Sequence, residues 1–217
     1  MENTTPTQTE STSSFNDEVK NFYKGGLKNI LTSMFSNPIE GTFLIFKNPA
    51  ANAFNQSLVI IASLFATYIA SIYIIAGEFR KYMSLSDFLK PSLVPVIMVL
   101  VITLLTFIVK AISGKPDFKG ELLTGAMCAI PIGLFAVVIV AFKIFAGENI
   151  LNSVKNPMEL GVVFMLILLY LFLHLINIVQ QSLKASGSKD ALAFYLSPAT
   201  VMFSVYITIK ISESLFS

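Results

Sequence analysis

Five long stretches of the chain contain no Asp, Glu, Lys or Arg. They are residues 48–77, 91–109, 122–142, 160–183 and 191–209, and each is 19 to 30 residues long. A helix needs about 20 apolar residues to cross the hydrocarbon core of a bilayer. Backbone groups in lipid must form their hydrogen bonds internally, and none of the stretches alternates as a barrel strand would. The pattern predicts an all-α, polytopic membrane protein, a bundle of five transmembrane helices.

The segment before the first span has an amphipathic pattern. Lys20, Lys24 and Lys28 follow one flank at four-residue spacing, from which long lysine side chains reach lipid headgroups. We expect an amphipathic helix that lies in the membrane interface. The alternative is a cytosolic helix docked on the bundle or on a partner. Apolar residues recur beside the lysines at steps of three and four: Val19, Phe22, Tyr23, Leu27, Ile30, Leu31, Met34 and Phe35.

Two features set the limits of this segment. Asn37 and Pro38 are typical of a helix start, and they predict a second short helix. Residues 1–14 hold eight Ser or Thr and no Lys or Arg, which predicts a solvated, disordered leader rather than a signal peptide. We therefore divide the chain into a Ser/Thr-rich leader (1–14), amphipathic juxtamembrane helices (15–47) and a five-helix transmembrane domain (48–217).

Composition and charge narrow the class of protein. Hydrophobic residues make up 54% of the chain and charged residues 13%, whereas an average globular chain is about 25% charged. These values exclude a soluble enzyme and a disordered protein, and the single cysteine excludes a disulfide scaffold. The net charge of +2 gives no electrostatic footprint for nucleic acid.

The basic residues predict an orientation. Nine Lys or Arg lie on the segments that share a side with the N-terminus and six lie on the other side. The positive-inside rule then places the N-terminus inside and the C-terminus outside. Arg80 is the only arginine, and the preference for lysine is typical of an AT-rich genome. We expect a bacterial cytoplasmic (inner) membrane.

Small residues predict how the helices pack. Residues four apart on the first and third spans form small-residue faces, which let helix backbones approach closely in lipid, so we expect these two helices at the bundle centre. Pro131 lies within the third span and is interpreted either as a packing adaptation or as a hinge. The small-residue faces consist of Ala62, Ala66 and Ala70 on the first span, and Gly125, Ala129 and Gly133 on the third.

Polar residues inside the spans are the candidates for a binding site. The fourth span carries them at steps of three and four, and the fifth span carries a milder stripe. Polar groups at membrane depth face the interior or a wet cavity, so one interpretation is a small polar pocket between the fourth and fifth spans. The other is ordinary hydrogen bonding between helices. The residues are Tyr170, His174, Asn177, Gln181, Thr200 and Ser204.

The sequence carries no pattern that names a reaction. His174 is the only histidine, and none of the five apolar stretches contains a carboxylate. Proton and sodium relays typically need buried carboxylates, so a coupled transporter is disfavoured. Phosphate-binding loops and zinc spacings are absent. We therefore predict no catalytic residues, no cofactor and no metal site.

Two stretches resemble bacterial members of the Yip domain family, which is named for proteins that interact with Ypt/Rab GTPases. One is Asn-Pro-Ile-Glu-Gly-Thr-Phe at residues 37–43; the other is Phe-Lys-Gly-Glu-Leu-Leu-Thr-Gly at 118–125, which runs on to Ile130 and Pro131. The resemblance covers residues 36–216. It implies five spans and a cytosolic N-terminus. The Asp-Leu-Tyr-Gly-Pro motif of eukaryotic members is absent, so a Rab-type GTPase is not carried over as a partner.

These observations leave two main hypotheses for function. The first is a non-enzymatic membrane scaffold or a protein- or lipid-interaction factor that works through residues 15–47. The alternative is a permease for small molecules or lipids that uses the polar pocket. Nothing positive supports a third, an intramembrane enzyme. Membrane lipids are the expected partners, together with another membrane protein or a second copy of the chain.

Overall fold

Helices form almost the whole of the described structure. A computed structural model describes residues 15–113, 115–146 and 157–216, so the leader predicted over 1–14 lies outside the described residues. Every element in the described ranges is helical, and five helices are long and apolar enough to cross a membrane. The predicted all-α membrane bundle is therefore confirmed. The five helices are α4 (Ala53–Ala76), α5 (Leu85–Ser113), α6 (Phe118–Ala146), α8 (Pro157–Ala185) and α9 (Asp190–Phe216).

The amphipathic segment folds as a chain of short helices that precede the first long one. They are α1 (Phe15–Asn21), a π-helical turn η1 (Phe22–Gly26), α2 (Leu27–Ser36) and α3 (Glu40–Lys47). The helix predicted after Asn37 and Pro38 is α3, which begins at Glu40. The backbone N–H of Glu40 donates to Asn37 Oδ1 at 3.3 Å. Asn37 thus lends its side chain to the first turn, as its type predicts.

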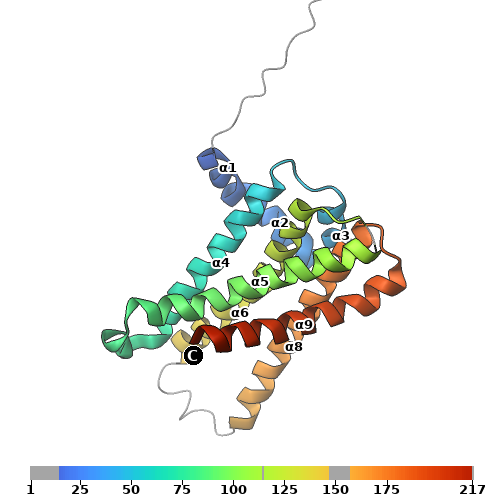
Figure 1. The fold of residues 1–217 in the computed structure, drawn as a ribbon. Helices are drawn as coiled ribbons and strands as arrows, with labels where there is room; N and C mark the ends of the chain where they lie inside the picture. The colour runs from blue at the N-terminus through green and yellow to red at the C-terminus, as the bar shows by residue number, and fades with distance from the viewer. Residues whose placement is uncertain (1–14, 114, 147–156, 217) are drawn as a thin grey trace, which may run out of the picture.

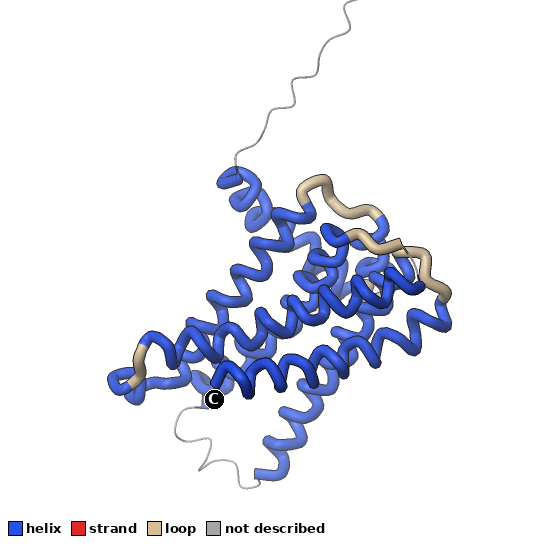
Figure 2. The backbone as a smooth tube through the Cα atoms, viewed as in Figure 1, coloured by secondary structure: helices blue, strands red, loops and turns tan. Residues whose placement is uncertain are grey.

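Helix α6 is the central element of the bundle. Residues 121–129 are buried without interruption, and a helix that is buried all round is a core helix. Helices α4, α5 and α8 pack directly on α6, and α9 packs on α5 and α8. The short helices α1–α3 lie beside one end of the bundle, at the level where α4 begins and α8 ends (Figures 1 and 2). They fill the gap between α4 and α8 there.

Glycines allow two helices to approach α6. A Cβ added to Gly125 would lie 2.0 Å from Thr103 Oγ1 and 2.9 Å from the carbonyl oxygen of Val99, so only glycine fits against α5 at that point. At Gly133 an added Cβ would lie 3.4 Å from Leu64 Cδ1, so the hollow there takes a leucine from α4. The third-span glycines therefore contact two different neighbours.

The first span packs on α6, but through a different face from the one predicted. Ala62, Ala66 and Ala70 are exposed on the outer surface of α4. Ile60 and Leu64 are buried toward α6 instead. The reason is that helices in lipid associate through van der Waals contact, and branched side chains that enter the hollow beside Gly133 offer more of it than alanines do. The alanine face points to the surroundings.

Pro131 lies within a continuous helix. Helix α6 runs through this residue from Phe118 to Ala146, and Pro131 is buried. The Tyr68 hydroxyl of α4 donates a hydrogen bond of 3.1 Å to the carbonyl oxygen of Ile132, the next residue. The proline is thus held by a neighbouring helix, and its role as a hinge stays a prediction.

Candidate functional site

The amphipathic segment is docked on the bundle through its apolar face. Phe22, Ile30 and Met34 are buried, and Met34 has no exposed surface. The lysines of the same segment, Lys20, Lys24 and Lys28, are exposed. The apolar stripe contacts protein, so the segment is docked on the bundle, which is compatible with both interpretations. Its position relative to a membrane surface stays a prediction.

Polar contacts fasten the segment to α4 and α8. Asn55 Nδ2 on α4 donates to Glu18 Oε2 at 2.7 Å. The hydroxyl groups of Tyr23 and Ser63 are hydrogen-bonded to each other. Asn177 Nδ2 on α8 donates to the carbonyl oxygen of Pro38 at 2.6 Å. These bonds fix the short helices at three separate points.

The polar stripe of the fourth span takes part in this docking. The ring of His174 stacks on Phe35 of α2, with centroids 5.0 Å apart and an angle of 7° between the planes. The ring of Tyr170 also stacks on the ring of His174, with the two centroids 5.7 Å apart. Gln181 Nε2 donates to Asn177 Oδ1 at 3.2 Å and so orients the amide that holds Pro38. The stripe therefore faces α2 and the turn before α3.

The fifth-span residues form a separate set. Thr200 donates to the carbonyl oxygen of Leu196 at 2.8 Å, and Ser204 donates to that of Thr200 at 2.7 Å. Both hydroxyls are thus satisfied by their own helix. Among the described hydrogen bonds and ring contacts of the six predicted pocket residues, none joins α8 to α9, and a polar pocket between these helices stays a prediction. Ser and Thr hydroxyls in a helix readily donate to a carbonyl oxygen of the preceding turn, which explains why the stripe on α9 needs no partner on another helix.

His174 retains one unsatisfied group. Its Nε2 is buried and has no hydrogen-bond partner among the described residues. A buried polar atom without a partner costs free energy, about 1–3 kcal/mol. Stacking on Phe35 and Tyr170 offsets part of this cost, because aromatic pairs contribute about 0.5–1.5 kcal/mol beyond the area they bury. His174 is therefore a contact residue of the α2–α8 seam.

A buried ion pair joins three helices at the same end of the bundle. Lys110 Nζ on α5 lies 2.7 Å from Glu121 Oε2 on α6, and the two residues are 5% and 1% exposed. Lys110 Nζ also donates to Ser182 Oγ on α8 at 2.8 Å. The Ser182 hydroxyl is in turn hydrogen-bonded to that of Thr124. Because every member has a partner, the arrangement is a closed clamp between α5, α6 and α8.

The sequence analysis found no carboxylate within the apolar stretches and missed this pair at their ends. A signal was present. Lys110 stands three residues before the end of α5 and Glu121 three residues after the start of α6. A short connection between antiparallel helices brings such positions to the same level. Opposite charges beside long apolar stretches then predict an ion pair.

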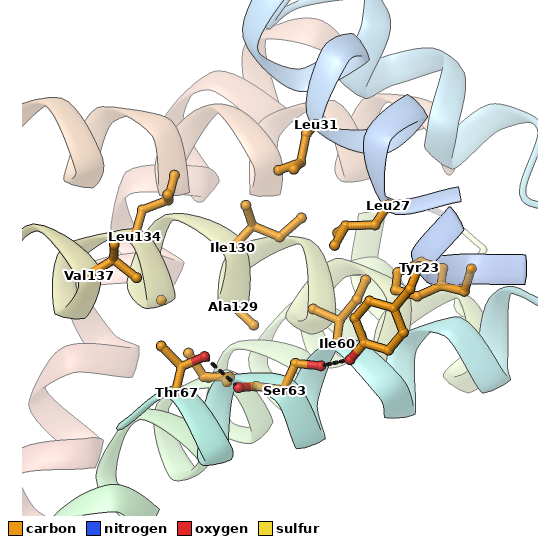
Figure 3. A pocket seen from close by; sticks show the side chains of 13 residues that line it. Tyr23, Leu27, Leu31, Ile60, Ser63, Thr67, Ala129, Ile130, Leu134 and Val137 are labelled. Carbon is orange, nitrogen blue, oxygen red and sulfur yellow. Dashed lines mark hydrogen bonds between the residues drawn. The ribbon is translucent and has the colours of Figure 1, made fainter. Parts of the chain in front are cut away.

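An apolar groove lies between the docked segment and the bundle (Figure 3). Its volume is about 190 Å³. Its three hydroxyl groups are occupied. Ser63 donates to the carbonyl oxygen of Val59 and Thr67 donates to that of Ser63, and the Tyr23 hydroxyl is hydrogen-bonded to the Ser63 hydroxyl. The walls therefore offer apolar contact and no group that would polarise a substrate. They are formed by Phe22, Tyr23, Leu27 and Leu31 of η1 and α2, Ile60, Ser63, Leu64 and Thr67 of α4, and Ala129, Ile130, Gly133, Leu134 and Val137 of α6.

The described residues contain no candidate metal site. In the ranges that the structure describes, no three His, Cys, Asp or Glu residues gather as ligands for a metal ion. Comparisons of the chain with protein-family models, curated proteins and solved structures found no match. The site is therefore interpreted from its own geometry, as a docked amphipathic segment above an apolar groove.

Proposed function

We propose that the chain is a non-enzymatic membrane scaffold, a protein- or lipid-interaction factor that works through the outer face of residues 15–47. The observation that carries the proposal is the two-sided use of this segment. Its inner face is fixed to α4 and α8 by Phe22, Met34 and Asn177. Its outer face stays free for contact.

The outer face combines positive charge with apolar side chains. Lys20, Lys24 and Lys28 are exposed, and Ile39 and Leu44 are 63% and 47% exposed. Such a surface suits the boundary between lipid headgroups and acyl chains, or the juxtamembrane part of another membrane protein. Docking fixes its orientation relative to the bundle, which is what a scaffold requires.

The resemblance to the Yip domain family is part of this proposal. The five long helices agree with the five spans that the resemblance implies. Residues 37–43, which carry part of it, form the turn and first helix residues that α8 holds through Asn177. We propose a structural relative of that family, without the Rab-type partner and in a bacterial inner membrane with the N-terminus inside.

Site-specific photo-crosslinking tests the scaffold. A photoreactive residue replaces Ile39 or Leu44 on the outer face, and Leu104, which is exposed on α5, serves as the control position. We expect a discrete protein adduct, or adducts with lipid headgroups, at positions 39 and 44 in native membranes and only acyl-chain background at 104. Equal patterns at all three positions would overturn the proposal.

Aspartate variants then separate contact from docking. Both variants are made in the protein that carries the photoreactive residue at position 44. Ile39→Asp changes only the outer face, whereas Phe22→Asp/Ile30→Asp enters buried positions and should release the whole segment. We expect both variants to abolish the adduct at position 44, while protease resistance of the five long helices shows that the bundle is intact. An adduct that survives both variants contradicts a role for residues 15–47.

The permease alternative has weaker support. The polar residues on which it rests, His174 and Asn177, are engaged with Phe35 and Pro38. Loss of uptake or export in His174→Ala, with α2 still docked, would favour the permease over the scaffold.

A further inference from the structure

We infer that the groove beneath α2 is a binding site for one acyl chain of an anionic phospholipid, whose headgroup lies at Lys24 and Lys28. The inference deepens the lipid-interaction part of the proposed function and rests on it. It names a lipid class, a place for the chain and a place for the charge.

The lining suits an acyl chain. Leu27 and Leu31 point down from α2 toward Ile130 of α6, with the Tyr23–Ser63 hydrogen bond at one end (Figure 3). An apolar cavity of about 150 Å³ holds benzene. A groove of 190 Å³ therefore takes about eight carbon atoms by the same measure, which is a substantial part of a lipid tail.

The groove opens to lipid rather than to water. Leu134 and Val137 form its far rim on α6, and they are 37% and 50% exposed. Both belong to a helix segment, Gly120–Ile144, that is apolar enough to cross the membrane. From Ala129 to Val137 the floor extends about 12 Å at 1.5 Å per residue. A chain can thus enter sideways from the bilayer and lie along α6.

Positive charge lies beside the groove. Lys24 and Lys28 stand three residues before the groove-lining Leu27 and Leu31, and residues three apart are neighbours on a helix surface. Both lysines are exposed. A lipid with its tail in the groove and a negative headgroup contacts both the apolar lining and the two lysines, whereas a neutral lipid gains only the apolar contact.

The dimensions disfavour a helix as the occupant. A helix with its side chains is at least 10 Å wide, so 12 Å of its length fills roughly 900 Å³. The groove is smaller than this. A partner protein or a second copy of this chain could place a single side chain there but not a helix.

Photolabelling with lipid tests the site. The full-length protein is placed in phosphatidylcholine nanodiscs that contain a phosphatidylglycerol with a photoreactive acyl chain, and labelled residues are mapped by mass spectrometry. We expect labels to concentrate on the groove rim at Thr67, Leu134 and Val137. Unlabelled phosphatidylglycerol should compete, and unlabelled phosphatidylcholine should compete poorly.

Two pairs of variants test the two halves of the inference. Thr67→Phe fills the groove without removing a bond between helices, because the Thr67 hydroxyl bonds its own helix. Ala62→Phe adds the same ring to an exposed position of the same helix. We expect groove labelling to fall at least about tenfold in Thr67→Phe, which corresponds to 1.4 kcal/mol, and to be unchanged in Ala62→Phe.

The second pair removes charge. Lys24→Gln/Lys28→Gln should weaken the preference for phosphatidylglycerol by up to about thirtyfold, at about fivefold for each lysine near an anionic surface. Lys115→Gln/Lys189→Gln removes the same charge from two exposed lysines at the same end of the bundle and should leave the preference unchanged.

Each other outcome overturns the inference. Labels spread evenly over the outer faces of α5, α8 and α9 would mean that the groove does not bind lipid. Equal competition by phosphatidylcholine would mean that the site does not select an anionic headgroup. A dimer crosslinked through the groove would identify a second copy as the occupant. If groove labelling succeeds while positions 39 and 44 give no adduct, the lipid site stands and the scaffold proposal fails; the reverse result has the opposite meaning.

Discussion

Breaking the Lys110–Glu121 pair should be one of the most destabilising changes available in this bundle. At 2.7 Å two unit charges attract each other by about 6 kcal/mol in a medium of effective dielectric constant 20. The cost of removing both groups from water offsets much of this attraction. Deleting one partner leaves the other charge buried, and that costs about 3–5 kcal/mol of stability.

The expected pattern over three variants is therefore non-additive. Lys110→Met and Glu121→Met should each lower the free energy of unfolding by about 3–5 kcal/mol. The double variant should lie within about 1 kcal/mol of the parent or above it, because two well-packed methionines remove both charges. Ser182 and Thr124 keep their mutual hydrogen bond in all three variants.

A buried cysteine can report the unfolding of these variants. Cys128 is the only cysteine, and it is fully buried one turn after Thr124. Its reaction with a fluorogenic maleimide, followed in detergent as temperature or denaturant rises, reports opening of the bundle core. Glu78→Gln at the exposed Glu78–Lys81 pair is the control and should leave the midpoint unchanged. Single variants as stable as the parent, or a double variant that loses the sum of the two, would refute the clamp.

Two further predictions concern packing. Gly125→Ala should destabilise the protein by about 1–3 kcal/mol, because the new Cβ would lie 2.0 Å from Thr103 Oγ1. In the control variant Gly161→Ala the new Cβ meets nothing within 4 Å, so the unfolding midpoint should not fall. Equal effects of the two variants would contradict the close approach of α5 and α6. Phe35→Ala removes the ring of α2 that stacks on His174, so hydrogen exchange in α2 should rise about tenfold, a loss of about 1.4 kcal/mol, while exchange in α6 stays constant. Unchanged exchange in α2 would mean that the stack does not hold the segment.

The sequence predicts the five long helices well because their signal is a simple absence. A stretch of 19 or more residues without charge has few alternatives in lipid. The faces through which these helices meet were harder to predict. The alanines at 62, 66 and 70 are evenly spaced, yet contact area favours Ile60 and Leu64 beside the hollow at Gly133. Spacing alone does not say which of two adjacent stripes points inward.

The candidate site was only partly accessible to sequence reasoning. The pattern identified the apolar face of residues 19–35 and the polar stripe on the fourth span, but it did not pair them with each other. Contacts such as Asn177 with Pro38 join positions 139 residues apart, and no local rule relates such positions. The groove was missed for the same reason, since three separate segments form its walls.

The one-sided position of α1–α3 has a consequence for the shape of the molecule. These helices lie beside the bundle only at the end where α4 begins and α8 ends (Figure 1), so they widen the protein there and not at the opposite end. Within a bilayer, volume that is added at one end of a protein displaces lipid from one leaflet and not from the other.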